Sequence, residues 1–308
     1  MRILVTGASG LLGLNLSLEA SKHHQVFGTV NTHNLHTPAF SIIQTDLTAP
    51  GAVERILEQT QPDWVINCAA LAIIDACEAN PPLARQLNVE LPEKLARIVA
   101  RGGARQDTVR LLHLSTDAVF DGRRGDYTEE DAPHPLSEYA RTKLEGELAV
   151  AAANPDAIIA RTNIIGWGLS GKRSLSEFFF YNLQANRRVM GFTDVYFCPL
   201  LANDLAHLLL AMLEKGLSGL YHVVCREGVT KYDFGVALAR RFNFDESLVD
   251  PTSVTRSGLK AARSPKLTLR PEKLARALSA PLPSWQEGLD RLFILYRKGY
   301  PQELKAMG

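Results

Sequence analysis

Residues 3–13 read Ile3-Leu4-Val5-Thr6-Gly7-Ala8-Ser9-Gly10-Leu11-Leu12-Gly13, and this stretch decides the fold. The apolar and β-branched run over 3–6 predicts a short strand, and the apolar residues that follow at helical spacing predict a helix over 11–22. Gly7, Gly10 and Gly13 stand between the two in a G-x-x-G-x-x-G pattern. Glycines here permit a tight turn and let the backbone approach a pyrophosphate, which then lies at the positive end of the helix.

The glycine pattern has two interpretations. A flexible strand-to-helix turn accounts for the glycines alone, whereas a dinucleotide site also requires that they follow the first strand directly, as they do here. The second interpretation is therefore favoured. It predicts that the backbone over 7–13, with Ser9, Leu11 and Leu12 as well as the three glycines, holds the pyrophosphate of a nicotinamide cofactor.

Short β-branched runs alternate with longer helical patterns through the first half of the chain. This alternation is typical of βαβ units and predicts an α/β fold with a doubly wound parallel sheet, the Rossmann arrangement. Ser137 is the expected N-cap of the last helix of this half. Strands are predicted at 3–6, 26–30, 41–44, 64–67, 109–114 and 157–160, and helices at 11–22, 52–59, 83–100 and 138–152.

After Arg161 the regularity weakens, and a second region begins near the loop over 166–171. No internal repeat or low-complexity linker separates the two regions, so we expect them to pack closely, with the substrate site in the cleft between them. Helices are predicted at 175–185, 203–214, 232–242 and 283–298, and a strand at 221–224.

The composition limits which partners and which cell compartment we expect for the protein. The 308 residues are 46% apolar and 22% charged, and a formal charge of +1 gives no electrostatic case for nucleic acid or an anionic membrane surface. No apolar run is long enough to span a membrane, so we expect a cytoplasmic protein with a small-molecule partner. The four cysteines show no metal-ligand spacing, which predicts reduced thiols and no metal site.

The residues at the ends of the next strands bear on the cofactor. The second strand ends in Asn31-Thr32-His33, without the acid that would hold a ribose 2′-hydroxyl, which favours NADP(H) over NAD(H) modestly because no arginine stands there either. Asp46 and Leu47 are placed to meet an adenine edge, although an Asp here is equally suited to capping. Small residues after the fourth strand would let the cofactor's sugars approach: Cys68, Ala69 and Ala70. Asn88 is either a polar support beneath the site or a helix-face residue.

Tyr139 and Lys143 are four residues apart and so share one face of a predicted helix. A tyrosine hydroxyl has an ordinary pKa of about 10, and a neighbouring ammonium would stabilise its phenolate and lower that pKa. The strand over 109–114 delivers Thr116 near the carboxyl edge of the sheet, where its hydroxyl could bind the reacting oxygen. Tyr139, Lys143 and Thr116 are the predicted catalytic residues, and the first two are also expected to contact the cofactor.

With these residues in place, the chain resembles the extended short-chain dehydrogenase/reductase family over nearly its whole length, and within it the dTDP-4-dehydrorhamnose reductases. The resemblance implies an oxidoreductase that reduces the ketone of a 4-keto-6-deoxy nucleotide sugar, with Tyr139 as the acid. It rests on the segments 65–70, 115–122, 129–131, 139–147, 161–162, 204–206, 219–222 and 263–267, together with Asn88, Tyr127 and Pro135.

The resemblance also implies interleaved regions: a cofactor-binding domain over 1–165, to which 199–226 return, and a substrate-binding region formed by 166–198 and 227–308. The resemblance leaves open whether the chain forms a homodimer.

The chain departs from the family pattern in two places. Ala118 replaces a tyrosine that is common in the family, which leaves the sugar substrate undefined. The segments 166–173 and 178–181 predict a differently shaped, more aromatic pocket, although an aromatic run more often belongs to the core. His113 and His222 are interpreted as structural.

Two other functions are compatible with the pattern. The beta subunit of methionine adenosyltransferase is similar to the same family, so a non-catalytic regulatory subunit is one alternative. A nucleotide-sugar epimerase with tightly held NAD is the other.

Overall fold

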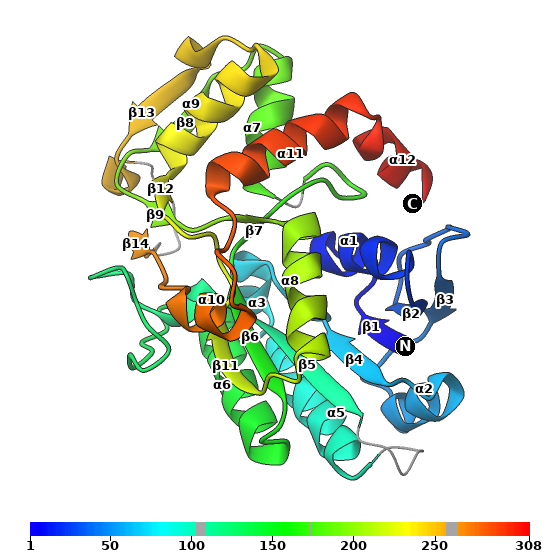
Figure 1. The fold of residues 1–308 in the computed structure, drawn as a ribbon. Coiled ribbons are helices and arrows are strands. Elements are labelled where there is room, and N and C mark those ends of the chain that lie inside the picture. Colours follow the sequence, from blue (N-terminus) through cyan, green and yellow to red (C-terminus); the bar gives the residue numbers. More distant parts are fainter. Residues whose placement is uncertain (103–108, 173, 257–263) are drawn as a thin grey trace.

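The computed structural model describes residues 1–102, 109–172, 174–256 and 264–308. Its centre is a seven-stranded sheet with the order β11-β6-β5-β4-β1-β2-β3, and every neighbouring pair is parallel. The doubly wound α/β fold predicted from the sequence is confirmed (Figure 1). The strands are β1 (Arg2–Thr6), β2 (Gln25–Val30), β3 (Ser41–Gln44), β4 (Trp64–Asn67), β5 (Arg110–Thr116), β6 (Ile158–Thr162) and β11 (Gly219–His222).

Side chains alternate across the strands and bury against helices on both faces of the sheet. Ile3 and Val5 belong to one apolar cluster, whereas Leu4 between them belongs to the other. On the first face α1 (Leu11–Ala20) packs against α8 (Ala202–Glu214). On the second face α5 (Leu91–Ala100) packs between α2 (Ala52–Thr60) and α6 (Glu138–Ala153). The Ser137 side chain caps α6 by accepting from the Ala140 N–H, as predicted.

The helix predicted over 83–100 ends at Ala100 as expected, but it begins two residues earlier, at Pro81, and it is not regular. The chain is helical from α4 (Pro81–Arg85) through a π-helical turn (Gln86–Glu90) into α5, and α3 (Ile74–Ala79) precedes them. Pro92 has no N–H to bond the carbonyl four residues earlier, which belongs to Asn88. A Cβ on Gly146 of α6 would lie 2.0 Å from that Asn88 oxygen, so α6 approaches the freed carbonyl only because residue 146 is glycine.

The second region lies at the carboxyl end of the sheet and is built around aromatic rings (Figure 1). Trp167, Phe180 and Phe242 form edge-to-face pairs at centroid distances of 4.9, 6.3 and 5.0 Å. The aromatic run over 178–181 therefore divides: Phe180 is core, whereas Phe178 is 46% exposed. Its helices are α7 (Leu175–Gln184), α9 (Lys231–Phe242), α10 (Glu272–Leu278), α11 (Trp285–Arg297) and α12 (Tyr300–Ala306).

Short strands that the sequence pattern did not predict complete the second region. β8 (Val189–Phe192) pairs with β13 (Val249–Thr252), β9 (Tyr196–Phe197) pairs with both β12 (Val229–Thr230) and β14 (Lys266–Leu267), and β7 (Ile164–Ile165) pairs with β10 (Leu200–Leu201).

Two later elements return to the central sheet. Strand β11 pairs with β6 at the edge of the sheet, and α8 covers its first face beside α1. Both follow the first part of the second region in the chain, so the polypeptide crosses between the regions more than once. The division into domains by residue number stays a prediction. Among the described residues, no helix is both long enough and apolar enough to cross a membrane.

Candidate active site

The turn between β1 and α1 is compact because two of its glycines leave no room for a side chain. Gly7 has φ +68°, and a Cβ on it would lie 2.9 Å from the backbone of Ala69. A Cβ on Gly13 would lie 2.2 Å from the carbonyl oxygen of Gly7. Any other residue at either position would push the turn away from α1 or from the segment after β4. The glycines thus bring three backbone segments together at one point.

From this turn a cavity of about 340 Å³ runs to Tyr139, and we call it the inner cleft. Its glycine-rich end lies at the N-terminus of α1, where the helix stabilises an anion, so this end could hold the pyrophosphate of a dinucleotide. It is lined by Gly10, Leu11, Leu12, Gly13, Cys68, Ala70, Ala72, Ser115, Thr116, Asp117, Tyr139, Thr162, Asn163 and Ile164.

Several predicted cofactor residues do not line the inner cleft. Asn31 lies exposed after β2, and its carbonyl accepts from Gln44 Nε2 at 3.0 Å. The Asp46 carboxylate accepts the backbone N–H and the hydroxyl of Thr48 at 2.9 and 2.6 Å, and these bonds lower its pKa. Leu47 is buried in the core on the second face of the sheet. The contacts of Asp46 are those of a turn-capping residue.

Asn88 is buried and makes three side-chain hydrogen bonds. Its Oδ1 accepts from Leu71 N at 2.9 Å, and its Nδ2 donates to Leu71 O at 3.1 Å and to Thr142 Oγ1 at 3.0 Å. Leu71 follows β4, and Thr142 lies between Tyr139 and Lys143 on α6. Asn88 therefore ties the chain beneath the inner cleft to the helix that carries the predicted catalytic pair.

The structure brings Thr116 and Tyr139 together where β5 ends and α6 begins. The Thr116 hydroxyl accepts the Ala118 N–H at 3.2 Å, donates to Asp117 Oδ1 at 3.2 Å and is hydrogen-bonded to the Tyr139 hydroxyl, which lowers the pKa of that tyrosine. Burial has the larger, opposite effect and raises the pKa of Tyr139 to about 12. Tyr139 thus carries its proton at neutral pH.

Lys143 is 4% exposed, and its ammonium donates to the Leu114 carbonyl at 2.6 Å. Burial lowers the pKa of Lys143 to about 8, and the charge of Glu147 opposes that shift. In this structure the Lys143 ammonium donates to a backbone carbonyl, and the groups that shift the Tyr139 pKa are its own burial, Thr116, Asp117 and Cys77. The expected effect of Lys143 on the Tyr139 pKa stays a prediction.

Sequence reasoning missed a buried ion pair one turn beyond Lys143. Arg161 Nη2 lies 2.7 Å from Glu147 Oε2, its Nε lies 3.0 Å from Oε1, and the Ser115 hydroxyl also donates to Oε1. The guanidinium stacks over Phe120 with its Cζ 5.0 Å from the ring centroid. The only signal was the spacing, since Glu147 follows Lys143 by four residues and so shares its helix face.

A second, larger cavity of about 600 Å³ adjoins the inner cleft, and we call it the outer cavity. The two share five lining residues: Ala72, Thr116, Asp117, Tyr139 and Asn163. The rest of the outer cavity is lined by Ile74, Ala118, Leu136, Ser137, Lys172, Ser174, Leu175, Phe178, Phe192, Val195, Tyr196, Phe197, Lys231, Ser264 and Leu267. Arg263, in the motif noted above, and Arg173 lie outside the described residues.

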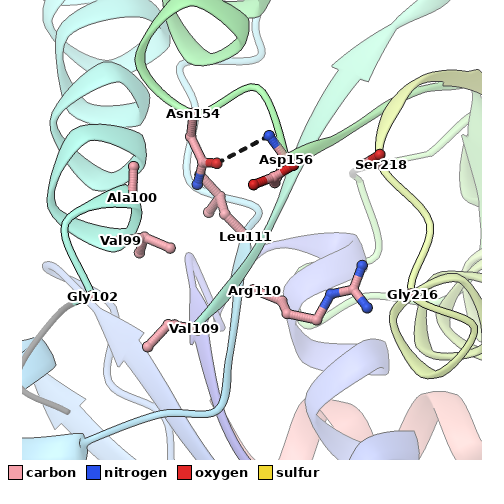
Figure 2. Close-up of a pocket in the computed structure, with 10 residues that line it drawn as sticks. All are labelled: Val99, Ala100, Gly102, Val109, Arg110, Leu111, Asn154, Asp156, Gly216 and Ser218. Atoms are coloured by element: carbon pink, nitrogen blue, oxygen red, sulfur yellow. Dashed lines mark hydrogen bonds between the residues drawn. The ribbon is translucent and has the colours of Figure 1, made fainter. Parts of the chain in front are cut away.

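A further cavity of about 390 Å³ lies at the opposite end of β5 (Figure 2). Arg110 lines this cavity, and its guanidinium donates to the carbonyls of Leu213 and Leu217 at 3.1 and 2.6 Å. These bonds hold β5 to the end of α8. Figure 2 also shows Asn154 bonded to the Asp156 backbone. These polar groups serve the fold, and the cavity is separated from Thr116 by the length of the strand.

Comparison with known proteins agrees with this geometry. The family model for the RmlD substrate binding domain matches residues 1–297. The chain belongs to that family. The predicted resemblance is confirmed, and like its reductase relatives this RmlD-family chain is an NAD(P)-dependent oxidoreductase.

Three relatives of this RmlD-family chain are informative. A dTDP-4-dehydrorhamnose reductase of Mycobacterium tuberculosis is 35% identical over 295 residues, 94% of this chain and 91% of that protein. Methionine adenosyltransferase 2 subunit beta of Mus musculus is 33% identical over 283 residues, 86% of this chain and 78% of that protein. A crystal structure of dTDP-4-dehydrorhamnose reductase from Bacillus anthracis in complex with NADP has a TM-score of 0.79 at 25% identity, covering 95% and 98% of the two chains.

Proposed function

We propose that the chain reduces the ketone of a 4-keto-6-deoxy nucleotide sugar with NAD(P)H. The observation that carries this proposal is the meeting of the inner cleft and the outer cavity at Thr116 and Tyr139. A cofactor in the inner cleft would supply a hydride to the ketone carbon. The carbonyl oxygen then needs one proton, and Tyr139 lines both cavities and can donate it.

The electrostatics of Tyr139 and Lys143 suit reduction. With a pKa of about 12, Tyr139 is protonated at neutral pH and therefore ready to act as an acid. Proton transfer leaves a phenolate, and Lys143, one turn along α6, supplies a positive charge near it below its pKa of about 8.

The outer cavity supports a nucleotide sugar as the substrate class. Its inner end carries the polar groups of Thr116 and Tyr139, which suit a sugar ketone. Lys172 and Lys231 lie in its wall and suit a diphosphate, and the exposed rings of Phe178 and Tyr196 offer flat apolar surface for a base. The dTDP-4-dehydrorhamnose reductase relative supports the same class. Ala118 lines the cavity where the family commonly has tyrosine, so we assign no particular sugar.

For the cofactor we propose a preference for NADP(H). Asn31 stands after β2 in place of an acid that would repel a 2′-phosphate, and the structure of the Bacillus anthracis relative is a complex with NADP. Calorimetric titration of the chain with NADPH and NADH tests the preference, and tighter binding of NADH would contradict it.

The regulatory-subunit alternative has a specific observation behind it, the similarity to methionine adenosyltransferase 2 subunit beta. The test is NADPH oxidation by the purified chain against a panel of 4-keto nucleotide sugars, with product formed in equal amount. Binding of NADPH with no turnover on any sugar, together with capture of a partner enzyme, would favour a regulatory subunit. Tightly bound NAD and interconversion of sugars without net oxidation would favour an epimerase.

A further inference from the structure

A cavity of about 380 Å³ lies between helices α7 and α12, and no step of the proposed reaction involves it. We call it the α7–α12 cavity. Its lining comes from the segment 170–172, from four residues of α7, from Arg187 shortly after that helix and from Lys305 on α12. Lys172 and Phe178 also line the outer cavity, so the two cavities adjoin. A ligand in the α7–α12 cavity would therefore lie beside a nucleotide sugar in the outer cavity.

The lining of the α7–α12 cavity carries more positive than negative charge. Three of its residues are cations, Lys172, Arg187 and Lys305, and one is an acid, Glu177. Glu177 is fully buried, and its carboxylate accepts two backbone N–H groups at 2.7 and 3.2 Å. Within the described part of the chain, none of the three cations forms a salt bridge with a carboxylate. The cavity therefore has positive charge available for an anion.

The guanidinium of Arg187 is held in place through one of its three nitrogens. Its Nε donates to Asn182 Oδ1 at 2.9 Å, and Asn182 Nδ2 donates to the Phe178 carbonyl at 2.7 Å. Among the described residues, Nη1 and Nη2 of Arg187 have no hydrogen-bond partner. Two N–H groups on one side of a fixed guanidinium match two oxygens of a phosphate.

Tyr181 brings the two lysine-bearing segments together. Lys305 Nζ lies over the Tyr181 ring, 4.6 Å from its centroid, and this cation–π contact holds the ammonium at the cavity. Gly171, which precedes Lys172, has φ +65°, and a Cβ on it would lie 2.8 Å from the same ring. The segment that carries Lys172 can therefore pack on Tyr181 because residue 171 is glycine. The lysines are thus placed by packing, although their side chains reach solvent.

We propose that the α7–α12 cavity binds the phosphates of a nucleotide through Lys172, Arg187 and Lys305. Three cations around one cavity suit a diphosphate, and the exposed ring of Phe178 offers apolar surface for a base or a ribose. The proposal rests on the proposed reductase function only for the class of ligand, because the adjoining outer cavity is assigned to a nucleotide sugar. The nucleotide is either the nucleotide half of the substrate, reaching past Lys172, or a free nucleotide beside the substrate.

Calorimetric titration with thymidine 5′-diphosphate tests the proposal, a probe that matches the dTDP-4-dehydrorhamnose reductase relative. The double variant Arg187→Gln/Lys305→Gln removes two cations that line the α7–α12 cavity but not the outer cavity. Because each exposed ion pair contributes a factor of a few to affinity, the dissociation constant should rise about tenfold.

Arg188→Gln is the matched control for the loss of charge. Arg188 follows Arg187 directly and is exposed, but it pairs with Asp250 at 2.7 Å and does not line the cavity. At physiological salt, where charges outside direct contact are screened, its dissociation constant should equal that of the wild type.

Kinetics distinguish the two sources of the nucleotide. If the substrate's own nucleotide occupies the cavity, the KM for a 4-keto nucleotide sugar rises in the double variant by the same factor as the dissociation constant. If a free nucleotide occupies it, the KM is that of the wild type and only inhibition by thymidine 5′-diphosphate weakens. Either result supports the site.

An unchanged dissociation constant in the double variant would overturn the proposal. An equal loss of affinity in Arg188→Gln, or no binding of thymidine 5′-diphosphate by the wild type, would overturn it as well. Both replaced side chains are exposed, so circular dichroism should show the wild-type fold. If the chain turns over no keto sugar but the double variant still weakens nucleotide binding, the reductase function fails and the site stands.

Discussion

The inner cleft and the outer cavity share the Thr116–Tyr139 junction but differ in how the chain builds them. The inner cleft is formed mainly by residues at the ends of parallel strands β1, β4, β5 and β6 and in the turns directly after them. The outer cavity collects residues from widely separated segments, including α7, β9, α9 and β14. The part suited to a cofactor is therefore encoded in short local motifs, whereas the part suited to a substrate depends on the whole second region.

The largest expected effect is at the junction itself. Tyr139→Phe removes the proton donor while keeping the ring, so turnover should fall by roughly 10²–10⁴-fold, the usual contribution of a general acid. Calorimetry should find NADPH affinity nearly unchanged. Tyr296→Phe is the matched control, because Tyr296 packs against Phe180 and lines neither cavity. Near-normal turnover in Tyr139→Phe would show that the cavities do not meet at a working acid.

The next largest effect is expected in the inner cleft, where a substitution should weaken cofactor binding without changing substrate binding. Gly13→Ala places a Cβ about 2.2 Å from the Gly7 oxygen, so the turn must open and NADPH should bind at least about tenfold more weakly, given the cost of overpacking. Gly288→Ala, whose Cβ would meet nothing closer than 3.8 Å, is the control. Substrate affinity measured without cofactor should be unchanged in both. Unaltered NADPH binding in Gly13→Ala would contradict the assignment of the inner cleft.

A smaller effect is expected on the outer cavity. Phe178→Ala should raise the KM for a nucleotide sugar several-fold, because one aromatic contact is worth about 1 kcal/mol, while NADPH affinity stays the same. Met190→Ala is a matched control, since Met190 is 47% exposed against 46% for Phe178 but does not line the cavity. Equal KM values for the two variants would remove Phe178 from the substrate site.

The smallest effect concerns a residue that the sequence assigned to the cofactor. Asp46→Ala loses the two bonds to Thr48, so the free energy of unfolding should fall by about 0.5 kcal/mol. Chemical denaturation measures this, and titration should show NADPH affinity unchanged. A clear loss of NADPH affinity would return Asp46 to the cofactor site and extend the inner cleft toward β3.

Local motifs could be predicted from the sequence, whereas features that depend on contacts between distant segments could not. The glycine turn, the alternation of strands and helices in the first half of the chain and the helix that carries Tyr139 follow from local periodicity and spacing, and the structure contains all three. The π-helical turn at Asn88 was missed because Pro92 lies inside an otherwise regular helical pattern. The short strands β9 and β14 carry too few residues for a periodic signal. The Glu147–Arg161 pair joins α6 to β6, and no local pattern encodes a contact between these two elements.

The most direct test of the central claim, that cofactor and sugar react across the Tyr139 junction, is deuterium transfer. The chain is incubated with a 4-keto-6-deoxy nucleotide sugar and NADPH that carries deuterium at both positions of nicotinamide C4, and the product is examined by mass spectrometry. The account predicts one deuterium on the reduced carbon of the sugar and an equal amount of NADP⁺. A product without deuterium, or no NADP⁺ with any keto sugar, would contradict it.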